Sequence, residues 1–521
     1  MSPHTAERPR AARSVLSRLT APGPLLAVGL GVTTVAASLW FATANRGLSP
    51  EATGALYAFY FLVGTIGTGV LAGLEQEMTR TVARAHAAGR PVGAAVRGQL
   101  RQAAGLAVVT VALLAAISPL LVSHWLGGSW PLLLALLAGL AATWASFLVR
   151  GVLAGCQDFP FYSGTLVVQG VATIVPSLAL TLAGSGHMLG YAFAFALAPL
   201  AAAASGLVSP ALRRSWRATG DVRTGADTRT DTAEEVAHAT AALAETQPTA
   251  ALAEPLAELP NLAELPDPAE PTAPATPARP PQPAEAPEPG GNPREKLILL
   301  TLATLVSQLL INAVPLIIGQ RLAGGDEAGR QLGKSLSSSM GLSRLALLCL
   351  FPLQAPLLPL LAAAAVRGDF REVRRKTGFL VGACLAAGAL GVGAVVAVGP
   401  WLLKTYFATE APLSRTFLSA LALSTAFLMT AFVLQSAQVA LNRHRVVFAS
   451  WAAGLAAMAA VFALPLAPLD AAGWAGIAGP LVVTVVAAVD VTLVTRPAPA
   501  AGDRHDQASQ AASVPAAVAG G

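Results

Sequence analysis

Apolar stretches about as long as a bilayer is thick recur along this chain, and they constrain its fold more than any other feature. Twelve of them run for roughly 18 to 25 residues each, and about 20 apolar residues in a helix cross the hydrocarbon core of a membrane. Composition agrees, because 54% of the 521 residues are hydrophobic and only 12% are charged, against roughly 25% in soluble proteins. The sequence therefore predicts an all-α integral membrane protein.

The predicted helices fall into two sets of six, separated by a long polar segment. The first set covers residues 25–44, 51–74, 102–123, 131–149, 161–183 and 188–208. The second set covers 297–320, 336–365, 378–399, 413–440, 446–464 and 472–494. We expect an N-terminal tail (1–24), a six-helix bundle (25–208), a linker (209–295), a second bundle (296–496) and a disordered tail (497–521).

The distribution of lysine and arginine predicts the orientation. With twelve spans and a cytoplasmic N-terminus, 24 of the 34 basic residues lie on the inside and 6 on the outside, as the positive-inside rule requires. A missed helix would invert every later loop and destroy this bias. We expect a multi-pass protein of a bacterial cytoplasmic membrane with both termini inside.

The segment 220–293 is rich in Pro, Ala, Glu and Thr, and it carries 13 acidic and 3 basic residues. Its low hydrophobicity predicts disorder, and a cytoplasmic protein is a conceivable partner for it. Subtracting its charge of −10 from the chain's +6 leaves +16 on the remainder. This basic excess follows from the positive-inside rule, so no nucleic acid partner is expected.

The two sets resemble a parallel repeat. In each, the loop after the second helix is the longest basic loop within its half, and the turn after the fourth helix corresponds, with Arg150 placed opposite Gln438. Because six is an even number, both halves have the same orientation. We expect two bundles related by a pseudo-twofold axis along the membrane normal, an architecture found in transporters with a central cavity.

Motifs of soluble catalysis are missing from the sequence. It contains no phosphate-binding G-x-x-x-x-G-K-[ST] loop, no H-E-x-x-H and no G-x-S-x-G. The three cysteines are scattered and form no C-x-x-C pair, so neither a metal site nor a disulfide framework is indicated. We expect no cofactor and no enzyme activity.

Arg344 is the candidate ligand-binding residue of greatest interest. It follows Ser337, Ser338, Ser339 and Ser343 inside the eighth apolar stretch, where an arginine is costly unless it faces water or a partner. Its guanidinium matches the oxygens of a diphosphate. The alternative is a structural arginine bound to a carbonyl or carboxylate of another helix.

Four amides accompany it as candidates for a polar cavity lining. Gln308 and Asn312 are spaced i, i+4 on the seventh helix and therefore share a face. Gln354 and Gln169 lie in the eighth and fifth helices. The alternative for each is a hydrogen bond that joins two helices.

The charged residues Glu75, Glu77, Arg80 and Arg84 follow the second helix without a break. They indicate a helix that extends into the headgroup region, with arginines on lipid phosphates; the alternative is a cytoplasmic gate or an entry site for a charged headgroup. Asp490, close to the end of the last helix, is expected to be a solvated carboxylate at the membrane interface.

Three stretches resemble one known family. They are Gly73-Leu-Glu-Gln-Glu-Met-Thr-Arg80, Arg150-Gly-Val-Leu-Ala-Gly-Cys-Gln-Asp-Phe159, and Gln308-Leu-Leu-Ile-Asn-Ala-Val-Pro315 together with Ser343-Arg344 and Gln354-Ala-Pro-Leu-Leu-Pro359. They are similar to actinobacterial Wzx-like polysaccharide exporters of the multidrug/oligosaccharidyl-lipid/polysaccharide exporter superfamily. The resemblance implies flipping of a polyprenyl-diphosphate-linked glycan by alternating access, with a cationic residue such as Arg344 on the diphosphate. The acidic linker departs from the common pattern.

The leading hypothesis is therefore a monomeric flippase that contacts membrane lipids and a lipid-linked glycan. A small-molecule or drug exporter of the same superfamily is the first alternative, although no carboxylate falls at mid-membrane depth in the first bundle, as the branch exporting cationic drugs requires. A membrane scaffold and a glycan-processing enzyme are further alternatives from other classes.

Overall fold

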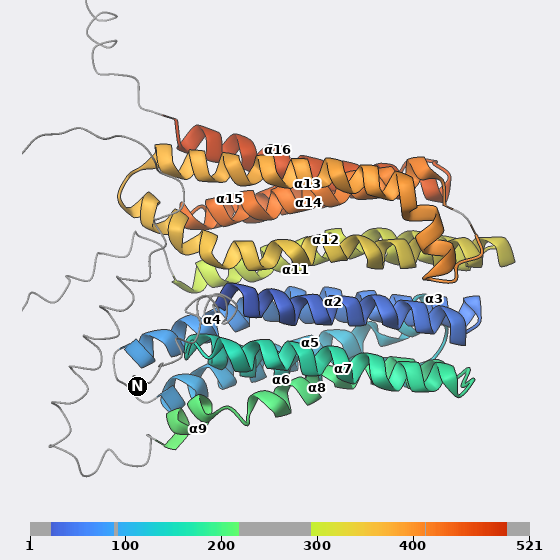
Figure 1. Ribbon diagram of the computed structural model, residues 1–521, viewed down its shortest axis with the longest axis horizontal. Coiled ribbons are helices and arrows are strands. Elements are labelled where there is room, and N and C mark those ends of the chain that lie inside the picture. Colours follow the sequence, from blue (N-terminus) through green and yellow to red (C-terminus); the bar gives the residue numbers. More distant parts are fainter. Residues whose placement is uncertain (1–21, 88–91, 218–292, 412, 497–521) are drawn as a thin grey trace, which may run out of the picture. The chain divides into compact units, whose positions relative to one another are not determined.

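The computed structural model describes residues 22–87, 92–217, 293–411 and 413–496, and these form long helices lying side by side (Figure 1). Most of the predicted acidic linker and the predicted tails lie outside the described residues. The helices of the first half are α2 (Pro22–Gly47), α3 (Pro50–Val63), the π-helix η1 (Gly64–Thr68), α4 (Gly69–Ala87), α5 (Val92–His124), α6 (Trp130–Gly155), α7 (Phe159–Leu182), α8 (Met188–Gly206) and α9 (Pro210–Arg217). Those of the second half are α11 (Pro293–Ala323), α12 (Glu327–Val366), α13 (Phe370–Thr405), α14 (Arg415–Ala440), α15 (His444–Phe462) and α16 (Pro468–Val494).

The described residues form twelve long helical segments, because α3, η1 and α4 make one continuous span. Eleven of the described segments are long and apolar enough to cross a membrane. The twelfth, α12, has 40 residues and packs against α2, α13 and α14. The prediction of an all-α membrane protein with about twelve spans in two six-helix bundles is confirmed.

Several helices extend beyond their predicted ends. The third span was predicted at 102–123 and is Val92–His124, and the ninth was predicted at 378–399 and is Phe370–Thr405. Hydropathy detects only the part of a helix that lies in hydrocarbon, whereas the backbone hydrogen bonds continue through the charged turns beyond it. Two ends of the molecule can now be distinguished: the Asn45 end, with the α2–α3 turn, and the Arg150 end, with the α6–α7 turn.

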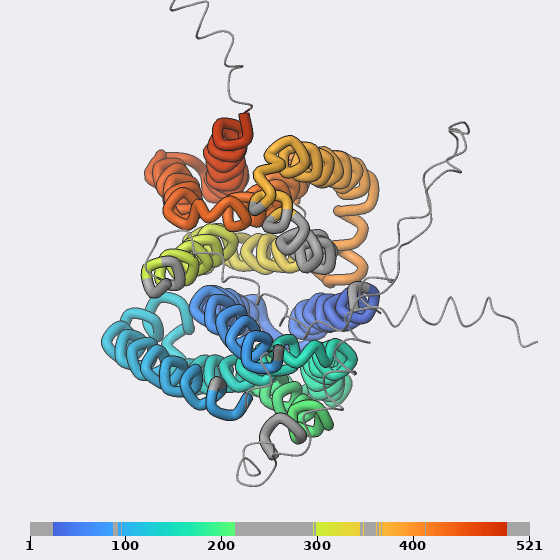
Figure 2. The backbone as a smooth tube through the Cα atoms, turned by 90° about the vertical axis from the view of Figure 1, so that its left-hand side faces the viewer, coloured from blue at the N-terminus to red at the C-terminus, as the bar shows by residue number. Residues whose placement is uncertain are grey.

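Helix packing demonstrates the internal repeat. Helix α2 packs on α7 as α11 packs on α15, and α4 packs on α6 as α12 packs on α14. Helices α6 and α7 contact α8 as α14 and α15 contact α16. The two halves meet where α2 contacts α12 and where α11 contacts α3, η1 and α4. Helix α2 corresponds to α11, and the α3–η1–α4 span corresponds to α12. The two contacts are therefore equivalent under the pseudo-twofold axis. Figure 2 shows the two groups of helices end-on.

The turn after the fourth helix has the same conformation in both halves. Gln157 and Asn442 adopt left-handed backbone conformations, with φ of 57° and 62°. The amide of Asp158 donates to the carbonyl of Leu153 at 2.9 Å, as the amide of Arg443 donates to Gln438 at 2.9 Å. These two turns end the helices in the same way.

This shared turn also fixes the register of the repeat. Gln157 corresponds to Asn442, so Arg150 corresponds to Gln435 rather than to Gln438, the position that the sequence comparison placed opposite it. The difference is three residues, which is less than one helical turn. The predicted correspondence of the two turns is confirmed, with this shift in register.

Glycines allow the helices of the first bundle to approach closely. A Cβ atom built at Gly155 of α6 would lie 2.6 Å from Cβ of Val82 and 2.9 Å from the carbonyl oxygen of Thr79, both in α4. Neither atom can move without shifting the α4 backbone. The contact between α4 and α6 therefore depends on the missing side chain.

We expect Gly155→Ala to lower the stability of the folded chain by about 1–3 kcal/mol, because overpacking forces the two backbones apart. The matched control is Gly164→Ala in α7, where an added Cβ would meet nothing within 4 Å and alanine favours the helix. Thermal unfolding of the purified protein in detergent measures both. Equal melting temperatures for the two variants would show that α4 and α6 are not tightly packed here.

Candidate functional site

A buried polar cluster joins the two bundles at the Asn45 end. The Nδ2 atom of Asn45, in the last turn of α2, donates to Oγ of Ser338 in α12 at 2.9 Å and to the carbonyl oxygen of Phe407 at 2.8 Å. The Nζ atom of Lys334 donates to the carbonyl oxygen of Asn45 at 2.7 Å. The hydroxyl of Tyr57, in α3, donates to Oδ1 of Asn45 at 2.5 Å. We call Asn45, Tyr57, Lys334 and Ser338 the Asn45 cluster.

Burial makes these bonds important for the closure of this end. Asn45 is 4% exposed and Lys334 is 7% exposed, so water cannot readily replace a lost partner. A buried polar group left without a hydrogen bond costs about 1–3 kcal/mol. Closing the seam satisfies the cluster, and separating the bundles requires water to take over all of its bonds.

Aromatic packing holds α2 and α3 in place beneath the cluster. The rings of Trp40 and Tyr60 stack at 5.4 Å, and those of Phe41 and Tyr57 lie 4.6 Å apart. The indole nitrogen of Trp40 also donates to the carbonyl oxygen of Tyr191 in α8 at 3.1 Å. The first bundle thus presents Asn45 from a rigid support.

The contact continues along α12 below the cluster. An added Cβ at Gly341 would lie 2.9 Å from the Phe41 ring, so the ring rests directly on the α12 backbone. Positions 334, 338 and 341 are spaced at helical intervals and therefore share the face of α12 that meets α2. At the edge of this contact, NH2 of Arg46 donates to the carbonyl oxygen of Thr405 at 3.0 Å.

A second seam joins α4 to α11. An added Cβ at Gly69 would lie 3.1 Å from Cα of Leu305, and one at Gly73 would lie 2.7 Å from Oγ1 of Thr301. Gly69 directly follows η1 and Gly73 lies about one turn further along α4, and π-helical turns are frequent at functional sites. The two bundles therefore meet along two seams, one polar (α2–α12) and one built on small residues (α4–α11).

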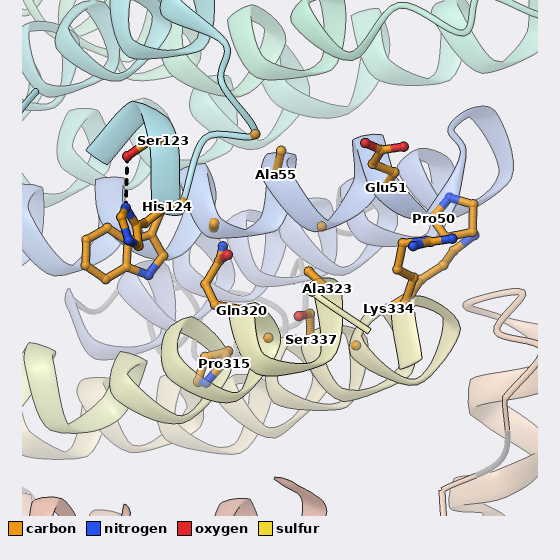
Figure 3. A pocket seen from close by; sticks show the side chains of 18 residues that line it. Pro50, Glu51, Ala55, Ser123, His124, Pro315, Gln320, Ala323, Lys334 and Ser337 are labelled. Atoms are coloured by element: carbon orange, nitrogen blue, oxygen red, sulfur yellow. Dashed lines mark hydrogen bonds between the residues drawn. The ribbon is translucent and has the colours of Figure 1, made fainter. Parts of the chain in front are cut away.

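A cavity of about 260 Å³ lies between the bundles beside the Asn45 cluster (Figure 3). The first bundle contributes α3 and the end of α5 to its wall, with Glu51 and His124. The second bundle contributes α11 and α12, with Gln320, Arg330 and Lys334. Lys334 thus belongs to both the cluster and the cavity wall.

A second cavity, of about 380 Å³, lies within the second bundle between α12, α13 and α14. Its wall is almost entirely apolar, with Leu342, Val395, Leu421 and Met429 among its residues. Ser339 and Ser343 of α12 and Thr425 of α14 supply the polar groups of its wall. Its lining suits a hydrocarbon chain rather than a charged group.

A buried charge cluster lies in the first bundle toward the Arg150 end. The Nε atom of Arg150 donates to Oγ1 of Thr165 at 3.0 Å, and NH2 donates to Oε1 of Gln169 at 2.6 Å. The hydroxyl of Tyr162 donates to Oε1 of Glu75 at 2.9 Å. Arg150 is 6% exposed. We call these five residues the Arg150 cluster.

Asp490 differs from its prediction as a solvated carboxylate. It is 8% exposed, and its Oδ1 accepts from NH2 of Arg443 at 2.7 Å while its Oδ2 accepts from Nε2 of Gln438 at 3.2 Å. The α14–α15 turn brings Arg443 to the end of α16, and the ion pair ties these helices together. Hydropathy placed Asp490 correctly near the end of the helix but could not reveal its partners.

The predicted amides separate into three situations. Gln308 lies at the α4–α11 seam, with its Cβ 3.5 Å from the Cβ position of Gly69. Asn312 is fully buried and donates from Nδ2 to the carbonyl oxygen of Gln308 at 2.8 Å. Gln169 binds Arg150 within the first bundle. The side chains of Arg344 and Gln354, in α12, lie outside the described residues.

The charged residues after the second span behave in two ways. Glu77 and Arg80 form an ion pair of 2.9 Å along α4, and α4 continues as a helix past Arg84 to Ala87, as a helix extension requires. Glu75 instead turns into the first bundle toward Tyr162. Glu75 therefore has different partners from the Glu77–Arg80 pair.

Sequence reasoning missed the Asn45 cluster and the burial of Arg150. Lys334 precedes the predicted eighth span, 336–365, but α12 begins earlier, at Glu327. An asparagine in the last turn of the first span was the available signal for Asn45. Arg150 follows the predicted fourth span, 131–149, but it lies inside α6.

No protein-family model and no curated protein matches this chain. Solved structures do. A structure described as the inward-facing conformation of a multidrug resistance MATE family transporter of the MOP superfamily is 14% identical, with a TM-score of 0.58 over 94% of this chain and 100% of the other. A structure described as the outward-facing conformation of such a transporter is 13% identical, with a TM-score of 0.57 over 91% of this chain and 96% of the other.

A MOP superfamily transporter from Pyrococcus furiosus is also similar, at 14% identity and a TM-score of 0.57 over 91% of this chain and 96% of the other. The description of that structure reports a binding pocket of reverse polarity that suggests a different function. These similarities extend over both bundles. The chain has the fold of the MATE transporters of the MOP superfamily.

Proposed function

We propose that this chain is a membrane transporter that works by alternating access, and that it exports small organic molecules. The observation that carries the proposal is the Asn45 cluster, which closes the seam between two similar bundles through hydrogen bonds whose groups become accessible to water only when the bundles separate. A transporter needs such a reversible closure at one end. Small-molecule export, the alternative considered from the sequence, agrees better with the multidrug transporters that share the fold than a glycan flippase does.

The charge distribution supports an orientation in which the Asn45 end faces the outer side of a bacterial cytoplasmic membrane. The basic turns around Arg97, Arg101, Arg371, Arg374 and Arg375 belong to the Arg150 end, and basic loops favour the cytoplasm. In this orientation the conformation described here is closed to the outside.

The substrate class follows from the carboxylates. The described residues of the first half contain four, Glu51, Glu75, Glu77 and Asp158. Glu51 lies in the first turn of α3, and Glu75 is 25 residues beyond Pro50, about 37 Å along the helix at 1.5 Å per residue. None of the four is at mid-depth of a hydrocarbon core about 30 Å thick. This arrangement favours neutral or anionic substrates over cationic ones.

The apolar cavity between α12, α13 and α14 favours a second candidate, the flippase for a polyprenyl-diphosphate-linked glycan. A prenyl chain matches the lining of that cavity, and the same helix α12 carries Arg344, three residues after Gly341. In this proposal Arg344 binds the diphosphate, and Gln308, Asn312 and Gln354 contribute polar groups.

A transport assay separates the two candidates. The purified chain in lipid vesicles is supplied with an anionic dye, a cationic dye, or a fluorescent glycan on a polyprenyl diphosphate, and movement across the membrane is recorded. We expect transport of the anionic dye in preference to the cationic one. Movement of the glycan lipid alone would establish the flippase, and movement of the cationic dye alone would contradict the substrate class.

Arg344 gives a further distinction. If it binds a diphosphate, Arg344→Ala should abolish movement of the glycan lipid, and Arg344→Lys should reduce it in part, because lysine keeps the charge but loses the planar fork. Arg367→Ala, an exposed arginine at the end of the same helix, is the matched control. Normal transport by the alanine variant, or its failure to accumulate, would assign Arg344 a structural or neutral role.

A further inference from the structure

Lys334 is the starting point, because its ammonium group is buried without an ion pair. It is 7% exposed, and the described residues place no carboxylate oxygen within ion-pair distance of Nζ. Its Nζ atom donates a hydrogen bond to the neutral carbonyl oxygen of Asn45. The carboxylate of Glu410 acts on it electrostatically, but Glu410 is exposed in the α13–α14 connection and forms no direct ion pair with Lys334. A buried charge of this kind is normally paired.

The cavity of about 260 Å³ beside Lys334 has room for the missing partner. A water molecule occupies about 30 Å³ in the liquid, so the cavity exceeds the volume of a phosphate or carboxylate group. An ammonium group has three donors, and the bond to Asn45 uses one of them. Lys334 therefore retains donors for a ligand in the cavity.

The other charges on the wall are already compensated. Arg330 donates to Oε2 of Glu327 at 3.0 Å and to the carbonyl oxygen of Gly325 at 3.1 Å. Glu51 is exposed and lies in the first turn of α3, where the helix dipole favours a negative charge. Neutral donors are available from Gln320 and Ser337 (Figure 3). Among the described charges on the wall, the buried one without an ion pair is thus the positive charge of Lys334.

We propose that this cavity binds an oxyanion, a phosphate or carboxylate group, through Lys334. Because α3 and α5 of one bundle and α11 and α12 of the other form the wall, the bound anion bridges the two bundles. An outward opening would separate these walls and release it. The anion therefore favours the closed Asn45 end, since a ligand shifts a conformational equilibrium toward the state that binds it better.

Binding of the anion does not depend on the proposed transport function, whereas its effect on opening rests on that proposed function. Isothermal titration calorimetry of the purified full-length chain with inorganic phosphate, at constant ionic strength, tests binding. We expect Lys334→Gln to weaken binding about tenfold, the loss of one charge-assisted hydrogen bond. The glutamine amide can still donate to the carbonyl of Asn45, and an unchanged melting temperature confirms that the variant folds.

Lys404→Gln is the matched control, because Lys404 is an exposed lysine near the same end of the second bundle and should leave phosphate binding unchanged. Absence of binding to the unsubstituted chain, or equal binding by Lys334→Gln, would overturn the proposal. So would calcium binding that depends on Glu51, because it would make the cavity a cation site.

The source of the anion is resolved in vesicles. If a lipid headgroup occupies the cavity, phosphate binds more weakly in vesicles that contain phosphatidylglycerol than in pure phosphatidylcholine. If the ligand is a free anion, the two compositions give the same affinity. The effect on opening is measured with cysteines at positions 45 and 338: phosphate should accelerate their bridging, and an unchanged rate alongside normal binding would refute the closing role alone.

Discussion

Bridging Asn45→Cys to Ser338→Cys with a short bifunctional thiol reagent should abolish transport, and cleaving the bridge should restore it. Nδ2 of Asn45 and Oγ of Ser338 are 2.9 Å apart across the seam between α2 and α12. A covalent link there prevents the bundles from separating at the Asn45 end, whichever substrate is carried. The experiment requires a background in which Cys156, Cys349 and Cys384 are replaced.

Its control is a bridge within one bundle. Oγ of Ser209 donates to Oδ2 of Asp158 at 2.5 Å within the first bundle, so cysteines at these two positions should bridge without affecting transport. Mass spectrometry quantifies the bridge, and transport is measured on the same sample. Undiminished transport by a fully bridged 45–338 pair would exclude opening at this seam.

The second large effect is expected from Arg150→Ala, which should destabilise the first bundle by about 3 kcal/mol or more. Arg150 is 6% exposed, and a buried polar group left without its hydrogen bond typically costs about 1–3 kcal/mol. Here Glu75 would lose the nearby positive charge, and Thr165 and Gln169 would lose their donor. Thermal unfolding in detergent should show a large decrease in the melting temperature.

Arg213→Ala, an exposed arginine in α9, should leave the melting temperature nearly unchanged. In a double-mutant cycle, Glu75→Gln combined with Arg150→Ala should cost less than the sum of the single changes, because the remaining charge is removed as well. Strict additivity would show that Glu75 and Arg150 do not interact.

The sequence was sufficient for the parts of this fold that depend on local composition. Apolar runs located the helices, and the basic loops together with the even number of spans predicted two halves of equal orientation. The ends of α5 and α13 were underestimated because their charged turns lie beyond the hydrocarbon and carry no hydropathy signal. Glu77 and Arg80, one helical turn apart, could be paired from spacing alone.

The candidate site depended instead on contacts between distant segments. Asn45 and Ser338 are separated by 293 residues, and no local pattern connects them. Lys334 falls outside the predicted eighth span because the mean hydropathy of the sequence rises only after it, whereas α12 already begins at Glu327. Arg150 could be recognised as basic but not as buried, since its partners Thr165 and Gln169 are brought to it by the α6–α7 turn.

The matching turns at Gln157 and Asn442 have a consequence for how such a chain could have originated. Each half begins and ends on the same side of the membrane, so a second copy joined to the end of the first would insert with the topology it had alone. Tandem duplication and fusion of one ancestral gene could therefore produce this architecture in a single step. A half with an odd number of spans would first have needed a reversal of its loop charges.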